Sequence, residues 1–171
     1  MPTILRSWLA FAAVGAGLIH CALVIGSPIA LAIPLAILGL IEFAWGVLVF
    51  SREIVPFPRV AIIVAFVPVI TWGVLLAFSA GSVVSSLGLL PLAVSTLFEL
   101  VIATALGVHL RRGTLKDAPP PFPSVGRYLL GLGTGALVVA GLTTLALAAT
   151  EAGTAAGPHS DVFQLPEHDD H

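Results

Sequence analysis

The chain has 171 residues, of which 58% are apolar and only 9% charged, and its mean hydropathy is +1.09. These values lie far outside the range of a soluble domain; the formal net charge is −2, and we expect no nucleic acid among the partners. The composition therefore predicts an all-α integral membrane protein.

Five apolar segments are long enough to cross a bilayer, because a helical span needs about 20 mostly apolar residues. The first segment has no small-x-small cleavage site and leads directly into a second apolar stretch, so we expect a retained helix and not a signal peptide. The five expected transmembrane helices cover roughly residues 4–26, 28–50, 59–79, 83–110 and 127–150.

The basic residues set the expected orientation, because cytoplasmic loops of membrane proteins are enriched in Lys and Arg. With five spans, all of them fall on the side of the N-terminus: Arg6, Arg52, Arg59, Arg111, Arg112, Lys116 and Arg127. The sequence therefore predicts an N-terminus in the cytoplasm and a C-terminus outside. A composition rich in Ala, Gly, Val and Leu, with a single Lys, is typical of GC-rich bacteria, so we expect a multi-pass protein of the bacterial plasma membrane.

Two similar segments indicate an internal repeat, since "PLAILGLIE" at 34–42 and "PLAVSTLFE" at 91–99 are identical at five of nine positions. They lie in the second and fourth spans, which run in the same direction. We therefore predict that spans one and two and spans three and four are a duplicated helical hairpin. The expected organisation is a four-helix unit at 1–110 with hairpins 1–52 and 53–110, a Pro-rich basic linker at 111–126, a fifth span at 127–150 and an acidic outer tail at 151–171.

Each copy of the repeat ends in a glutamate, and the two glutamates lie at similar depth. Glu42 and Glu99 precede Arg52 and Arg111 by ten and twelve residues, which is roughly 15–18 Å along a helix and close to mid-membrane. Small residues share their helix faces, as is typical of surfaces on which membrane helices pack, so both carboxylates are expected to face protein. The small residues on these faces include Gly39, Gly46, Ala103 and Gly107.

We predict that the glutamates belong to an interior polar cluster with His20, on a small-residue face of the first span, and Thr71, its repeat equivalent. A charged carboxylate at the bilayer centre costs about 2.5–3.5 kcal/mol on insertion scales, so it must be paired, protonated or hydrated. No Lys or Arg lies at that depth in the sequence. We therefore expect a protonated glutamate, a pair with His20, or a cation or partner chain that supplies the charge. The alternative is that both acids are neutral and only hydrogen-bond between helices.

Three further features carry expectations about packing. Gly131 and Gly135 form a G-x-x-x-G pattern in the fifth span, which predicts close contact with the other four helices or with another protein. Pro34 and Pro91 are repeat equivalents, and we expect each to bend its span. The single Cys21 has no partner for an intramolecular disulfide.

The tail combines imidazoles and carboxylates, which are ligands suited to Zn²⁺ or Cu²⁺. We expect it to bind a divalent transition metal or to dock on an extracytoplasmic partner, and the alternative is a tail that simply stays hydrated. The candidate ligands are His159, Asp161, Glu167, His168, Asp169, Asp170 and His171.

Three classes of function remain, and the absence of a catalytic or nucleotide-binding motif favours a protein that is not an enzyme. The first is a non-catalytic accessory or assembly subunit of a larger bacterial membrane complex, such as a redox or metallo-enzyme. Its partners would be other integral membrane subunits and the lipid bilayer. The alternative is a small proton- or cation-coupled transporter that uses the paired glutamates. A cofactor carrier would need His20, His109 or the tail to hold a metal.

The orientation is testable by cysteine labelling. In a Cys21→Ala background, Ser160→Cys places a single thiol on the side predicted to be outside, so a membrane-impermeant thiol reagent should label it in intact cells. Protection of that thiol until the cells are permeabilised would refute the predicted orientation.

Overall fold

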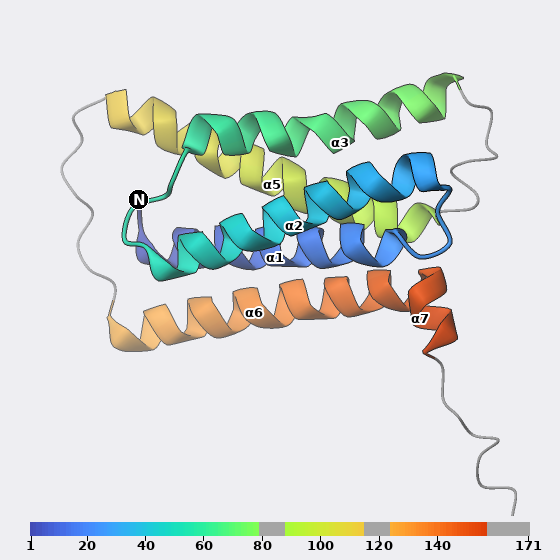
Figure 1. Cartoon of the computed structure of the whole chain (residues 1–171). Helices are drawn as coiled ribbons and strands as arrows, with labels where there is room; N and C mark the ends of the chain where they lie inside the picture. Colours follow the sequence, from blue (N-terminus) through green and yellow to red (C-terminus); the bar gives the residue numbers. More distant parts are fainter. Residues whose placement is uncertain (79–87, 115–123, 157–171) are drawn as a thin grey trace, which may run out of the picture.

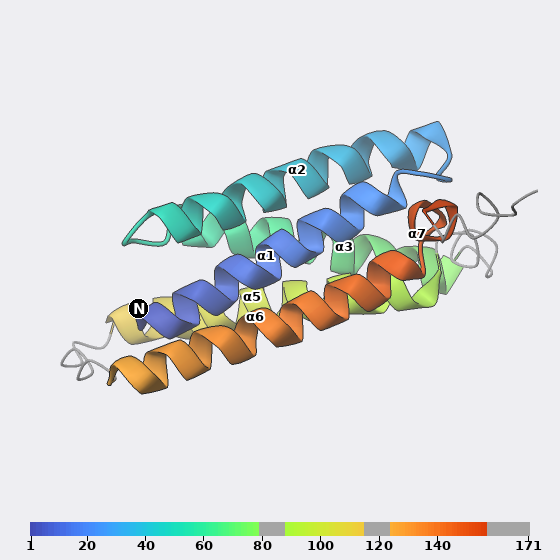
Figure 2. The ribbon, with the colours of Figure 1, turned by 90° about the horizontal axis from the view of Figure 1, so that it is seen from below.

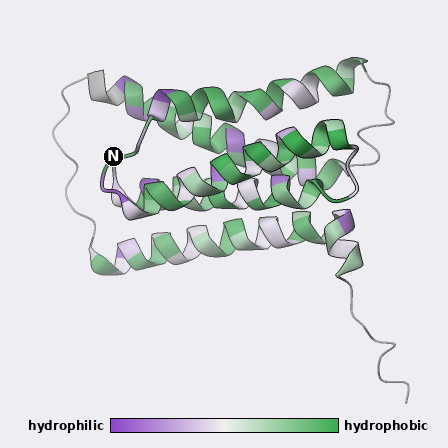
Figure 3. Cartoon of the chain, in the orientation of Figure 1, coloured by the Kyte–Doolittle hydropathy of each residue, from purple (hydrophilic) through white to green (hydrophobic). Residues whose placement is uncertain are grey.

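The computed structural model is all-helical and describes residues 1–78, 88–114 and 124–156. In this part of the chain five helices are long and apolar enough to cross a membrane. They lie side by side (Figure 1), and hydrophobic residues cover most of their length (Figure 3). The chain is therefore a multi-pass membrane protein. The helices are α1 (Thr3–Leu23), α2 (Ile29–Ser51), α3 (Pro58–Phe78), α5 (Leu89–Thr114) and α6 (Val125–Ala148).

The observed helices agree with the predicted spans to within four residues at each described end. The predicted start of the fourth span, at residue 83, lies outside the described residues. α1 ends at Leu23, where a short turn follows. In this turn Gly26 adopts φ 82°, which a residue with a Cβ rarely adopts, and Pro28 then precedes the first residue of α2.

α1 is the central helix, because α2, α5 and α6 all pack on it, whereas α3 packs chiefly on α5. Figure 2 shows α1 between α2 and α6. Small side chains give α1 this position: Ala10, Ala13 and Ala16 are buried, on faces of the helix that its neighbours cover. Without such small residues, three helices could not approach one helix closely.

The closest approach is between α1 and α2, and glycines permit it. A Cβ atom on Gly39 would lie 2.8 Å from the carbonyl oxygen of Gly17 and 2.7 Å from Sγ of Cys21. Two turns away, toward the end of α2 and the start of α1, a Cβ on Gly46 would lie 3.0 Å from the carbonyl oxygen of Ala10. The small face that the sequence indicates around Glu42 is thus the face in contact with α1.

The G-x-x-x-G segment of α6 lies against α1. Trp8 of α1 donates a hydrogen bond from Nε1 to the carbonyl oxygen of Gly131, at 2.9 Å. A Cβ on Gly135 would lie 2.6 Å from the same nitrogen, so the indole occupies the space that this glycine leaves. The G-x-x-x-G pattern was predicted to contact the other four helices or another protein. In the structure it contacts α1.

The two repeat prolines differ in position. Pro34 lies in the interior of α2, whereas Pro91 is the third residue of α5 and lies in its first turn. Backbone N–H groups of a first turn have no partner within the helix, so a proline there removes no hydrogen bond. The prediction that Pro91 bends the fourth span was therefore wrong, and the bend expected at Pro34 stays a prediction.

The described basic side chains gather at one end of the bundle, where α1, α3 and α6 begin and α2 and α5 end (Figure 1). α2 and α5 run in the same direction, as a duplicated hairpin requires. The duplication itself and the orientation across the membrane stay predictions. The basic residues at this end are Arg6, Arg52, Arg59, Arg111 and Arg127.

A short helix that the sequence analysis missed, α7 (Glu151–Ala155), follows α6 at the opposite end of the bundle (Figure 1). The side chain of Thr150 caps it by accepting a hydrogen bond from the backbone N–H of Gly153, at 3.1 Å. A threonine followed by an acidic residue is a typical helix start, and this local signal could have identified α7. The helix packs on the ends of α1 and α6.

The α1–α2 contact gives a stability prediction. Gly39→Ala adds a methyl group where no space exists, so the two backbones must separate, at a cost of about 1–3 kcal/mol. We expect a lower midpoint of thermal unfolding in detergent. Gly73→Ala on α3 is the control, since nothing lies within 4 Å of its added Cβ. Equal midpoints for both variants would contradict the close contact.

Candidate functional site

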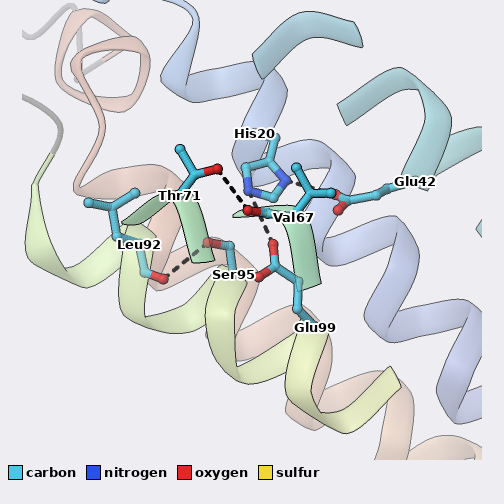
Figure 4. Close-up of polar contacts among 7 residues, drawn as sticks. All are labelled: His20, Glu42, Val67, Thr71, Leu92, Ser95 and Glu99. Carbon is cyan, nitrogen blue, oxygen red and sulfur yellow. Dashed lines mark hydrogen bonds and ion pairs between the residues drawn. The ribbon is translucent and has the colours of Figure 1, made fainter. Parts of the chain in front are cut away.

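Three helices bring one histidine and two glutamates together in the interior. His20 comes from α1, Glu42 from the middle of α2 and Glu99 from the middle of α5, and Figure 4 shows the imidazole between the two carboxylates. Their exposed fractions are 0%, 6% and 1%. We call these residues the His–Glu–Glu cluster.

The imidazole uses a different ring nitrogen toward each carboxylate. Nδ1 lies 2.7 Å from Oε2 of Glu42, the distance of a strong charge-assisted hydrogen bond. Nε2 lies 3.4 Å from Oε1 of Glu99, close enough for an ion pair but too far for a good hydrogen bond. The ring therefore bridges the carboxylates in a line from Glu42 through His20 to Glu99.

Helix geometry explains how His20 reaches the glutamates. It lies in the last turn of α1, beyond the middle of that helix. Side chains in a helix tilt toward its N-terminus, so the ring points back along α1 toward the level of the carboxylates. The close α1–α2 approach at Gly39, three residues before Glu42, places that carboxylate beside the ring.

Glu99 is the least satisfied member of the cluster. Both of its carboxylate oxygens, and Nε2 of His20, are buried and have no hydrogen-bond partner among the described residues. Ser95, one turn before Glu99, directs its hydroxyl to the carbonyl oxygen of Leu92, at 3.1 Å. A buried polar group without a partner is costly, so the Glu99 end of the cluster has unused capacity for a proton or another cation.

Charge counting leads to the same conclusion. The described arginines lie at the ends of the helices, so His20 is the cationic candidate beside the two carboxylates. A protonated imidazole with two ionised carboxylates carries one net negative charge. An uncompensated charge in the membrane interior is unfavourable, so the cluster needs one further positive charge, either a proton on a carboxyl group or a bound cation.

The donor atoms of the cluster also suit a metal ion, since one atom from each residue can be chosen so that all lie within 4.8 Å of one another. A zinc ion needs its N and O ligands at about 2.0–2.2 Å from a common centre. In the observed arrangement the imidazole stands between the carboxylates and turns a different nitrogen to each. The geometry is therefore that of an imidazole hydrogen-bonded to Glu42 and ion-paired with Glu99, and a metal would require the ring or a carboxylate to move.

The structure does not bring every predicted residue into the cluster. Thr71 is exposed on α3 and donates its hydroxyl to the carbonyl oxygen of Val67, one turn earlier, at 2.7 Å (Figure 4). Ala103 is buried beside Glu99 on α5, but a Cβ on Gly107 would have no described atom within 4 Å. The small-residue face of α5 is thus in contact only along part of its length.

The predicted metal ligands of the tail lie outside the described residues, so the hypothesis of a zinc or copper site there stays a prediction. They are His159, Asp161, Glu167, His168, Asp169, Asp170 and His171.

A cavity of about 220 Å³ adjoins the cluster, and sequence reasoning missed it. Glu42 contributes to its wall, together with Trp45, which lies one turn further along α2. Trp45 donates a hydrogen bond from Nε1 to the carbonyl oxygen of Pro56, at 2.9 Å. Trp45 follows Glu42 by three residues, so both side chains lie on one face of α2. This spacing could have identified Trp45 from the sequence. The lining residues are Ala13, Ile41, Glu42, Trp45, Phe57, Val60, Ala61, Val64, Ala65 and Ile102.

The cluster gives a second stability prediction. His20→Leu removes the bridge and leaves two buried carboxylates without it, which should cost about 3–5 kcal/mol and lower the thermal midpoint in detergent. The triple variant His20→Leu, Glu42→Leu, Glu99→Leu leaves no buried charge and should recover most of the loss. If the triple variant is no more stable than His20→Leu, the loss reflects packing and not charge.

The comparisons with known proteins give no match for this chain: none among models of protein families, none among curated proteins and none among solved structures.

Proposed function

We propose that the protein is a small proton-coupled membrane carrier in which the His–Glu–Glu cluster holds the coupling proton. The observation that carries this proposal is the buried imidazole between two carboxylates, because the described residues offer them no Lys or Arg. Intramembrane ionisable residues of this kind are typical of proton and ion pathways.

The cluster has two states that differ by one proton. With a proton on Glu99, the imidazolium and the ionised Glu42 balance each other, and the cluster is neutral. When that proton leaves, one net negative charge remains, and the state is favourable only when another cation neutralises it. Proton release is thereby linked to binding of a positively charged substrate.

The imidazole provides the route between the carboxylates. In the singly deprotonated cluster, a neutral ring with its proton on Nδ1 can accept a proton on Nε2 from Glu99 and give the proton on Nδ1 to Glu42, so a proton's charge crosses without movement of the ring. Glu42 is 6% exposed and borders the cavity, whereas Glu99 is 1% exposed and is not among the residues that line it. We therefore assign proton exchange with the surroundings to Glu42 and proton storage to Glu99.

A second candidate function, the accessory or assembly subunit, is favoured by a different observation. α6 exposes Gly133 and Gly141, and a Cβ on either would meet no described atom within 4 Å. Exposed glycines are typical of surfaces that receive another helix. A complex that contained this chain could use the face of α6 for assembly and the cluster for proton transfer.

The proton-carrier proposal is tested by infrared spectroscopy of the protein in lipid nanodiscs during a pH titration. The wild-type protein should show a C=O band from a buried carboxylic acid that disappears as the pH rises and the proton leaves. Glu99→Gln keeps the size and most of the hydrogen-bonding capacity of the side chain but cannot release a proton, so it should remove this band while leaving expression and monodispersity unchanged.

Glu53→Gln is the matched control, because Glu53 lies in the exposed connection between α2 and α3. It should leave the band as in the wild-type protein. A band that does not respond to pH would show that the acids are permanently neutral and serve only as hydrogen-bonding groups between helices. A pH-responsive band that survives both Glu42→Gln and Glu99→Gln would also overturn the proposal.

A further inference from the structure

The cavity beside Glu42 reaches from the lipid-facing surface to the centre of the bundle. At its rim, Ile41 of α2 and Val60 of α3 are 49% and 56% exposed. At its floor, Ala13 of α1 and Ile102 of α5 are buried. A molecule dissolved in the bilayer can therefore reach Glu42 sideways, between α2 and α3.

The packing of the helices accounts for this opening. α2 packs on α1 and α3 packs on α5, whereas α2 and α3 make few direct contacts with each other. A second cavity, of about 110 Å³, lies along the same boundary, and two helix-interior prolines, Pro34 and Pro68, contribute to its wall. Two such spaces between the same helices make α2 and α3 the natural entrance.

The lining of the first cavity combines a carboxylate with apolar and aromatic walls. Among its described lining residues Glu42 is the one ionisable group, and its Oε2 is already bonded to His20. No described hydrogen bond uses the other oxygen. Trp45 adds an indole, whose face attracts cations. Its hydrogen bond to Pro56 fixes the indole to the chain that leads into α3.

We propose that this cavity binds a lipophilic organic cation, an ammonium group with apolar substituents, that enters from the bilayer between α2 and α3. This inference rests on the proposed function, because it names the class of cation that replaces the coupling proton. A neutral hydrocarbon would make no use of the buried carboxylate. A small metal cation would find one carboxylate in a wall otherwise without oxygen-bearing side chains, whereas Ca²⁺ or Mg²⁺ prefers several oxygen ligands.

The exchange conserves charge. The O–H bond of the protonated cluster breaks, its proton leaves to water, and the ammonium group takes its place beside the carboxylate of Glu42 without forming a covalent bond. One proton is released for each cation bound. The apolar substituents contact Ala61, Val64 and Ala65 of α3, which form the wall facing Glu42 across the cavity.

The experiment compares two probes of the same shape. Benzyltrimethylammonium is a cation, and neopentylbenzene is its neutral analogue with carbon in place of nitrogen. Binding to the full-length protein in detergent is followed by tryptophan fluorescence and by the shift in thermal midpoint, and proton release is followed with a pH dye in weakly buffered solution. We expect the cation to bind on the order of tenfold more tightly than the analogue, with release of one proton.

Three variants locate the site. Glu42→Gln should abolish the preference for the cation and the proton release. Trp45→Leu should weaken cation binding, and Trp45→Phe should restore part of it, because phenylalanine keeps an aromatic face. Glu53→Gln, an exposed carboxylate outside the helices, should leave both signals unchanged.

The outcomes separate this inference from the proposed function. Equal affinity for both probes, or no binding of the cation, would overturn the inference, while a pH-responsive carboxyl band would still support the proton carrier. Preferential binding of the cation without proton release would support the inference and overturn the proposed coupling. Cation binding that persists in Glu42→Gln would place the ligand elsewhere and overturn the inference.

Discussion

The interior of a membrane does not tolerate a charge without compensation, and the rest of this structure follows from how the chain meets that constraint. Two carboxylates from different helices share one imidazole, so α2 and α5 must both pack on α1. That packing is possible because glycine and alanine line the central helix. The contact between His20 and Glu42 therefore depends on the close approach of α1 and α2 at Gly17 and Gly39. The small residues let the helices approach, and the approach brings the two polar side chains into contact.

Much of this arrangement could be predicted from the sequence, because the signals are local. The length and apolarity of the segments predicted the five spans. The number of residues from Glu42 to Arg52 and from Glu99 to Arg111 predicted that the two glutamates lie at a similar depth in the membrane. Helical spacing then placed Glu42 on the face of Gly39 and Gly46, and the structure has that face against α1. His20 was the one imidazole within a span and away from its basic end, so charge compensation made it a candidate partner of the glutamates.

The remaining features depend on contacts between helices that no local pattern encodes. Thr71 matches His20 in the repeat, but α3 packs on α5 and turns this residue outward. Gly107 belongs to the same face of α5 as Glu99, yet the neighbouring helices do not extend along it. The cavity beside Trp45 lies between α2, which packs on α1, and α3, which packs on α5. A sequence shows which faces are small or polar, but not where two helices fail to meet.

The central position of α1 has a consequence for how the protein enters the membrane. α1 is the least apolar and the most buried of the five spans, and it precedes all of its partners in the chain. Its weaker affinity for lipid and its buried imidazole make it a poor anchor until α2 follows. α2 is more apolar and brings Glu42 to His20. The insertion machinery should therefore release α1 and α2 into the bilayer together, as a hairpin in which the second helix secures the first.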